Sequence, residues 1–110
     1  MARYHYVILS RSKPGREDEY RRWYAEHHLH DVARQPGVIS ARLFAPDVQR
    51  VYDLDAPAYV LMTIYELETD DPEALLAKIR GMSGSDEMPA TDAIDKSGMV
   101  QIVGHQIAAV

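Results

Sequence analysis

Cysteine is absent from the 110 residues of this chain, which excludes disulfide bonds, thiolate catalysis and cysteine-ligated metals. Runs of Lys and Arg are also absent and the net charge is −5, so nucleic acid is not expected as a partner. No apolar stretch approaches the roughly 20 residues that cross a bilayer, so no membrane association is expected. A first predicted strand near Tyr4 leaves no room for a signal peptide. These absences favour a cytoplasmic protein.

The residues that are present are those of a folded domain. Hydrophobic residues make up 46% of the chain and charged residues 26%, proportions typical of globular domains. A length of 110 residues is close to the most common domain size, so we expect a single domain over residues 1–110. A chain this short buries only a moderate part of its surface, which favours self-association.

The pattern of apolar and turn-forming residues predicts the element order β-α-β-β-α-β. Strands are predicted at 4–10, 38–44, 58–66 and 99–109, helices at 17–34 and 72–80, a polar connection at 46–57, and a loop at 82–97 with a short helical turn after Thr91. This order is typical of the α+β ferredoxin-like fold, with a four-stranded antiparallel sheet and two helices on one face. Because the strands are apolar on both faces, we expect the second face to bind another copy, giving a homodimer.

Residues 23–32 concentrate polar aromatic and ionisable side chains on one predicted helix, including three histidines. With the α-helical period of about 3.6 residues, Tyr24 and His28 share the stripe that faces the sheet. Asp31 lies one turn beyond His28 and is placed to accept its N–H, which would orient the ring and raise its basicity. We predict that His28 transfers a proton, that Asp31 orients it and that Tyr24 stabilises an oxyanion. An error of one residue in the helical phase would exchange His28 for His27.

Four further residues are candidate walls of a substrate pocket, although packing is the simpler explanation for aromatic residues on strands and helices. They are Trp23, Tyr6, His105 and Tyr65. A metal site would need ligands from the first helix together with His105 or His5 from the strands. The spacing motifs of metal sites are absent, so neither a metal nor another cofactor is expected.

Several motifs resemble the EthD-like family of the dimeric α/β-barrel superfamily. They are Trp23-Tyr24, His28-Leu29-x-Asp31-Val32, Pro36-Gly37-Val38 and Ser40-Ala41-Arg42, followed by weaker agreement at Tyr59-Val60-Leu61, Tyr65-Glu66 and Met88-Pro89-x-x-Asp92-Ala93-Ile94-Asp95. His30 replaces the proline that is usual in this family. The resemblance implies a homodimer whose two sheets form a barrel, with a pocket between the sheet and the helices of each subunit.

Relatives in that superfamily include lactone isomerases, polyketide cyclases, dehydratases, quinol monooxygenases and haem-degrading enzymes, and the fold alone does not choose among them. The chain contains no asparagine, so the Asn-Trp-His site of the haem-degrading and related monooxygenase members cannot be formed. The favoured hypothesis is a cofactor-independent isomerase, cyclase or lyase that acts on a lactone, aromatic or polyketide-like substrate. The alternative is a non-catalytic ligand-binding or accessory protein of a degradation pathway.

Overall fold

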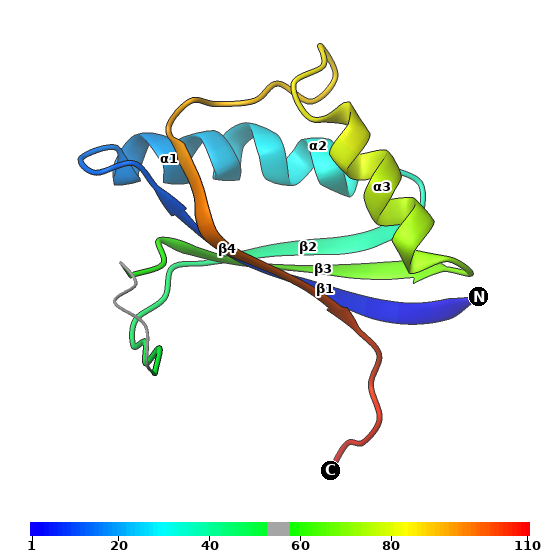
Figure 1. Cartoon of the computed structure of the whole chain (residues 1–110). Helices are drawn as coiled ribbons and strands as arrows, with labels where there is room; N and C mark the ends of the chain where they lie inside the picture. Colours follow the sequence, from blue (N-terminus) through cyan, green and yellow to red (C-terminus); the bar gives the residue numbers. More distant parts are fainter. Residues whose placement is uncertain (53–57) are drawn as a thin grey trace.

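A computed structural model describes residues 1–52 and 58–110, and the predicted connection 46–57 therefore lies partly outside the described residues. The elements are β1 (Ala2–Ser12), α1 (Glu17–Trp23), the π-helical segment η1 (Tyr24–His28), α2 (Leu29–Ala33), β2 (Val38–Phe44), β3 (Leu61–Thr69), α3 (Pro72–Met82) and β4 (Ile94–Gly104). The predicted α+β ferredoxin-like fold is confirmed (Figure 1).

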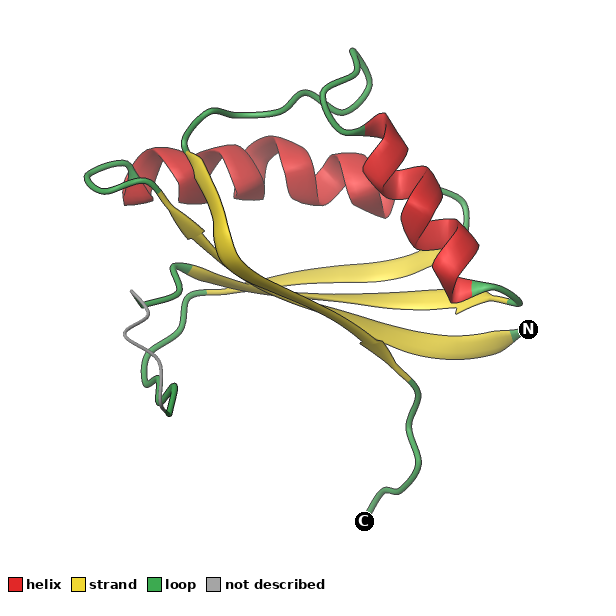
Figure 2. Cartoon of the chain, in the orientation of Figure 1, coloured by secondary structure: helices red, strands yellow, loops and turns green. Residues whose placement is uncertain are grey.

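The strands form one antiparallel sheet in the order β2-β3-β1-β4. All helices lie on one face of this sheet, while the described residues leave the opposite face without a covering layer (Figure 2). Pairing of Tyr6 with Tyr65 and Val103, and of Val7 with Ile64 and Ile102, assigns alternate residues to the two faces. The helix-covered face therefore holds the core, and the opposite face carries the second apolar set of each strand.

Several predicted strand boundaries are wrong, most of all those of β4, and a side-chain contact explains its early start. Strand β4 begins at Ile94 instead of residue 99 and ends at Gly104. Its polar beginning pairs with the long β1 strand, where the Arg11 guanidinium and the Asp95 carboxylate are 3.3 Å apart. A turn at residues 92–93 follows Thr91, at the place where a short helical turn is predicted, and the Thr91 hydroxyl accepts a hydrogen bond from the Ala93 N–H at 3.2 Å. Strand β3 likewise begins three residues later than predicted, at Leu61.

The first helix is continuous from Glu17 to Ala33, but its middle is π-helical. The Leu29 N–H donates to the Tyr24 carbonyl, the i to i+5 bond that defines a π-helical turn. Such turns occur mostly as single bulges within α-helices, frequently at functional sites. The bulge coincides with the Tyr24–His28 segment in which the sequence concentrates its candidate catalytic side chains.

Candidate functional site

The π-helical turn brings three aromatic side chains into mutual contact. The His28 imidazole stacks on the Trp23 indole with ring centres 4.7 Å apart, and meets the Tyr24 ring edge-on at 4.9 Å. In a regular α-helix, residues five apart point in clearly different directions. The additional residue in the turn is therefore what lets Trp23 and His28 stack.

Buried phenols extend this cluster from the helix to the sheet. The hydroxyl oxygens of Tyr24 and Tyr65 are 3.1 Å apart, and the Tyr6 ring packs on the Tyr65 ring at 5.7 Å. Burial raises the pKa of Tyr6 to about 12 and also raises the pKa values of Tyr24 and Tyr65. All three phenols are therefore protonated at neutral pH.

Tyr65→Phe is expected to lower the free energy of unfolding by about 1–2 kcal/mol, because the substitution takes a hydrogen-bond partner from the buried Tyr24 hydroxyl. Chemical unfolding in urea measures this change. Tyr52→Phe is the matched control, since Tyr52 is 80% exposed. Equal stability of the two variants would show that the Tyr24–Tyr65 pair contributes nothing to folding.

His28 is held as a neutral ring. Its Nδ1 atom is buried and has no hydrogen-bond partner within the described residues. Burial lowers the pKa of His28 below its usual value of 6.5, and the charge of Asp31 opposes this shift less strongly. A neutral imidazole retains a nitrogen lone pair, so His28 can accept a proton at neutral pH.

The predicted hydrogen bond from His28 to Asp31 is wrong. The Asp31 carboxylate instead accepts a hydrogen bond from the Arg34 guanidinium, one turn further along the helix. A hydrogen bond from the charged Arg34 guanidinium is stronger than one from a neutral imidazole, which favours this partner for the carboxylate. Asp31 thus affects His28 through its charge and makes no direct bond to it.

The lowered pKa of His28 predicts that stability falls as the pH decreases. The unfolded state takes up a proton near pH 6.5, before the folded state does, so protonation below this pH favours unfolding. One histidine can lower the free energy of unfolding by at most about 1.4 kcal/mol for each unit by which the pH falls. Urea unfolding between about pH 7.5 and pH 5.5 is expected to show a smaller loss for His28→Phe than for the wild type.

The control for this pH measurement is His27→Phe, because His27 is the adjacent residue and is exposed. This variant is expected to keep the pH dependence of the wild type. If His27→Phe and His28→Phe flatten the pH dependence to the same extent, the neutral state of His28 is not its cause.

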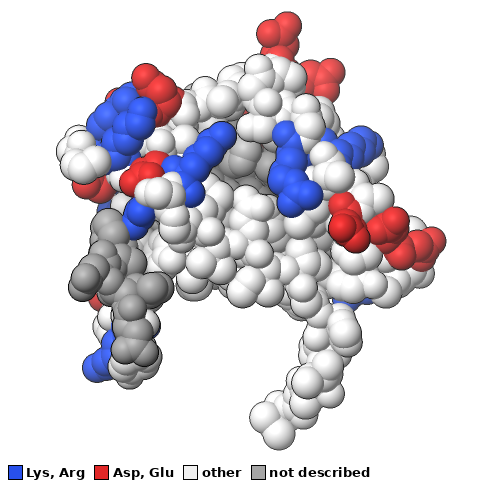
Figure 3. Space-filling view, viewed as in Figure 1, with Lys and Arg blue, Asp and Glu red and all other residues white. Residues whose placement is uncertain are grey.

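Two cavities flank the aromatic cluster. One, of about 550 Å³, lies between α2 and the segment that follows α3, and its lining residues are His27, Asp31, Arg34, Gln35, Asp86, Glu87 and Pro89. The other, of about 320 Å³, lies between α3 and the end of β4, and its lining residues are Tyr4, Pro72, Glu73, Leu76, Arg80, Val103, Gly104 and His105. Figure 3 shows a hollow on the face that carries β4, with basic side chains on both sides of it.

The structure brings most of the predicted site residues together, but not all of them. Trp23, Tyr24, His28, Tyr65 and Tyr6 form one continuous cluster. The remaining two lie elsewhere: Asp31 lines the first cavity, whereas His105 lines the second, where its ring meets the Tyr4 ring edge-on. The predicted site is therefore divided between the cluster and the two cavities.

Two further residues contribute to this region: Tyr20, which helical spacing places on the same stripe as Tyr24 and assigns to packing, and Arg80, which sequence reasoning missed. Tyr20 is fully buried, stacks on Trp23 with ring centres 6.0 Å apart, and donates its hydroxyl proton to the Ser10 hydroxyl at 2.9 Å. Arg80 lines the second cavity and lies close enough to Tyr6 to affect its pKa. Helical spacing associates Tyr20 with Tyr24, but no sequence signal associates Arg80 with Tyr6.

Within residues 1–52 and 58–110, no three His, Asp or Glu side chains are arranged to hold a metal ion. No helix in the same part of the chain is long and apolar enough to cross a membrane.

Comparison with known proteins identifies the fold. No model of a protein family and no curated protein sequence matches the chain. An EthD family protein from Bacillus halodurans C-125 is 18% identical, with 94% of this chain and 99% of that protein covered and a TM-score of 0.57. MhuD, a haem-degrading protein from Mycobacterium tuberculosis with two haems bound in its active site, is 17% identical, with 97% and 98% covered and a TM-score of 0.60.

A proposed monooxygenase from Shewanella loihica PV-4 is also similar, at 17% identity, with 98% of this chain and 97% of that protein covered and a TM-score of 0.59. The resemblance to EthD-like proteins is thereby supported at the level of the fold. Similarity at these identities shows a shared architecture and transfers no reaction.

Proposed function

We propose that this protein binds a small organic molecule and transforms it by acid/base chemistry without a cofactor, as an isomerase, cyclase or lyase does. The observation that carries the proposal is the neutral His28 ring, whose buried Nδ1 has no partner within the described residues. Buried polar atoms are nearly always hydrogen-bonded, so an exception calls for an explanation. A role in proton transfer to and from a bound substrate supplies one.

The proposed chemistry uses groups that are already in contact. His28 removes a proton from the substrate and returns it at another atom, which needs a base that is neutral at physiological pH. Tyr24 donates a hydrogen bond to the oxygen on which negative charge develops, and the Tyr65 hydroxyl at 3.1 Å keeps the Tyr24 hydroxyl oriented. Lactones and polyketide-like compounds carry acidic C–H groups next to carbonyl oxygens, and phenols carry an acidic O–H group, as this chemistry requires.

Haem does not fit the residues described here. Three carboxylates, those of Asp31, Asp86 and Glu87, line the larger cavity and would repel the two propionates of the porphyrin. The smaller cavity holds only about 320 Å³. The chain also contains no asparagine with which to form the Asn-Trp-His site of haem-degrading members. No step of the proposed reaction therefore depends on haem.

A binding protein without turnover is the second candidate. Tyr24 and Tyr65 are both buried in the core, and neither of the two cavities is lined by His28, Tyr24 or Tyr65. This arrangement favours a ligand that lies beside the aromatic cluster and is held without being transformed. Chemical conversion of a bound compound separates the two candidates.

A thermal-shift screen against lactones, phenols, quinones and aromatic polyketide mimics tests the proposed function. A ligand at 100 times its Kd adds about 2.7 kcal/mol of stability, enough to raise Tm by several degrees in a domain of this size. Each stabilising compound is then incubated with the protein and analysed for conversion. Failure of every compound class to stabilise the wild type would contradict small-molecule binding of this kind.

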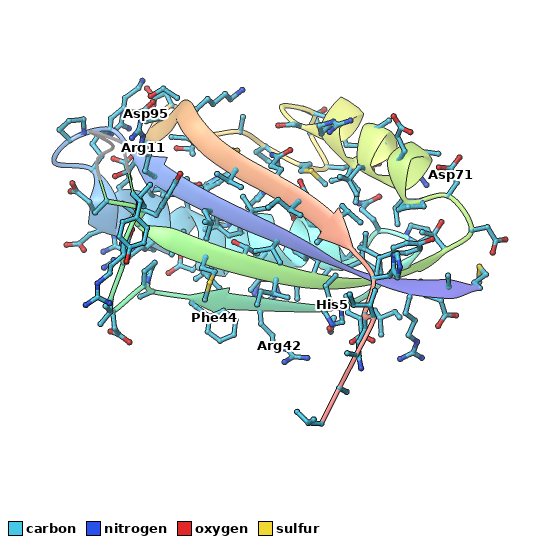
Figure 4. The ribbon with its side chains drawn as sticks, turned by 60° about the horizontal axis from the view of Figure 1, so that its bottom comes forward. His5, Arg11, Arg42, Phe44, Asp71 and Asp95 are labelled. Atoms are coloured by element: carbon cyan, nitrogen blue, oxygen red, sulfur yellow. The ribbon has the colours of Figure 1, made fainter. Side chains whose placement is uncertain are left out.

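We also propose that two copies associate through their uncovered sheet faces. Figure 4 is turned to bring the underside of the molecule forward, and its labelled Arg42 and Phe44 extend outward from β2. Apolar side chains of all four strands contribute to this face: Val7, Leu9, Phe44, Met62, Ile64, Val100 and Ile102. Of these, Ile102 is 60% exposed and Phe44 is 39% exposed. Contiguous apolar surface of this kind marks an interaction site.

A further inference from the structure

The smaller cavity is a groove between α3 and the paired ends of β1 and β4. Its strand side carries Tyr4 and His105, whose rings meet edge-on with centres 6.5 Å apart. Its helix side carries Leu76 between two charged residues, Glu73 and Arg80. A volume of about 320 Å³ is at the lower end of the range for ligand sites. A groove of this volume suits a molecule with a single ring.

The charge of this groove is concentrated at its two ends. Glu73 lies in the first turn of α3 and Arg80 in the last, so their backbones are about 10 Å apart along the helix. Arg80 forms no ion pair with any residue in 1–52 or 58–110. An unpaired guanidinium at the edge of a concave aromatic site is suited to a carboxylate, which it can bind through two parallel hydrogen bonds.

Arg80 also connects the groove to the aromatic cluster. Its charge lowers the pKa of Tyr6, although burial has the larger, opposite effect. Tyr6 packs on Tyr65, whose hydroxyl meets that of Tyr24. An anion bound by Arg80 would therefore lie at the edge of the cluster that contains His28.

We propose that this groove binds a small aromatic carboxylate, with the carboxylate on Arg80 and the ring against Tyr4, Leu76 and His105. The inference rests on the proposed function, because it names the class of substrate that the same region would accept. Arg80 is a specificity-determining residue in this arrangement: it selects an acid over the corresponding neutral compound and leaves proton transfer to the cluster.

Benzoate and benzamide are matched probes for this proposal, since they share a ring and differ in charge. Titration of each into ¹⁵N-labelled protein, followed by two-dimensional NMR, reports both affinity and location. Benzoate is expected to bind with a Kd of about 1 mM, as suits a fragment of this size. The shifted amide signals should belong to α3 and to Val103, Gly104 and His105 at the end of β4. Benzamide should bind about tenfold more weakly.

Arg80→Gln is expected to weaken benzoate binding about tenfold and to leave benzamide binding unchanged, because an exposed charge-assisted bond is worth roughly that factor. Lys78→Gln is the matched control, since Lys78 is exposed on the same helix and does not line the groove. This variant should bind both probes as the wild type does.

The proposal would be overturned by equal affinity for benzoate and benzamide, by equal weakening of benzoate binding in Lys78→Gln and Arg80→Gln, or by the absence of saturable benzoate binding at about 10 mM. Benzoate shifts confined to the cavity around Asp86 would overturn it as well. The proposed function is judged separately by the thermal-shift screen. Stabilisation by a neutral lactone or phenol that is equal in wild type and Arg80→Gln would retain that function and reject the carboxylate preference.

Discussion

Replacement of Ile64 by aspartate is expected to leave the chain folded but monomeric. Ile64 lies on β3, between Val7 of β1 and Arg42 of β2 in the sheet register, and faces away from the helices. In a face-to-face dimer this position is buried, and an unpaired carboxylate there costs several kcal/mol. Dimer affinity should fall by at least about 100-fold. Sedimentation velocity over a range of protein concentrations measures the change.

The matched control for this experiment is Ala77→Asp, which adds the same charge at an exposed position of α3. Its sedimentation should equal that of the wild type. A second variant, Ile102→Glu, tests the same face from the edge strand β4, where folding depends less on the side chain because Ile102 is 60% exposed. A wild-type protein that sediments as a single chain of 12.5 kDa at high concentration would contradict the dimer.

The fold follows from sequence because its signals are local and repeated. Runs of β-branched and aromatic residues that are apolar on both faces mark the strands. Asp71-Pro72 marks the start of α3, where the Asp71 carboxylate accepts a hydrogen bond from the Ala74 N–H at 3.0 Å. The errors occur where long-range pairing prevails over composition. The polar residues from Asp95 to Gly98 resemble a loop, but Ile94 and Asp95 pair with Ser12 and Arg11 of the long β1 strand, and β4 therefore begins before the irregularity that follows them.

The site is less predictable, because its geometry depends on one additional residue in a helical turn. A wheel of 3.6 residues per turn correctly brings Tyr24 beside His28, yet it misses the stacking of Trp23 on His28. It also predicts a bond from Asp31 to His28, whereas Asp31 binds Arg34. No sequence pattern in this helix predicts a π-helical turn. The location of Arg80 near Tyr6 depends on the packing of α3 over the sheet, which only the fold determines.

His28→Gln is expected to lower kcat/KM by about 10²- to 10⁴-fold for a compound that the wild type converts, which is the usual contribution of a general base. Glutamine preserves polarity and approximate size but accepts no proton at neutral pH. The free energy of unfolding of His28→Gln should stay close to that of the wild type, so the loss of kcat/KM cannot be attributed to unfolding. Substrate binding by the variant, measured by calorimetry, should stay close to that of the wild type, because the lost interaction acts in the transition state.

The pH profile distinguishes a base from a merely structural ring. His28 must be neutral to accept a proton, and burial lowers its pKa below 6.5. The wild-type rate should therefore remain constant as the pH decreases past 6.5 and fall only on further acidification, at the pKa of the folded state. Tyr24→Phe should lower the rate but leave the pH at which it falls unchanged, since the Tyr24 phenol stays protonated throughout. A pH profile that is unaltered in His28→Gln would assign proton transfer to another group. An unchanged rate in both variants would show that the aromatic cluster serves only to pack the helix on the sheet.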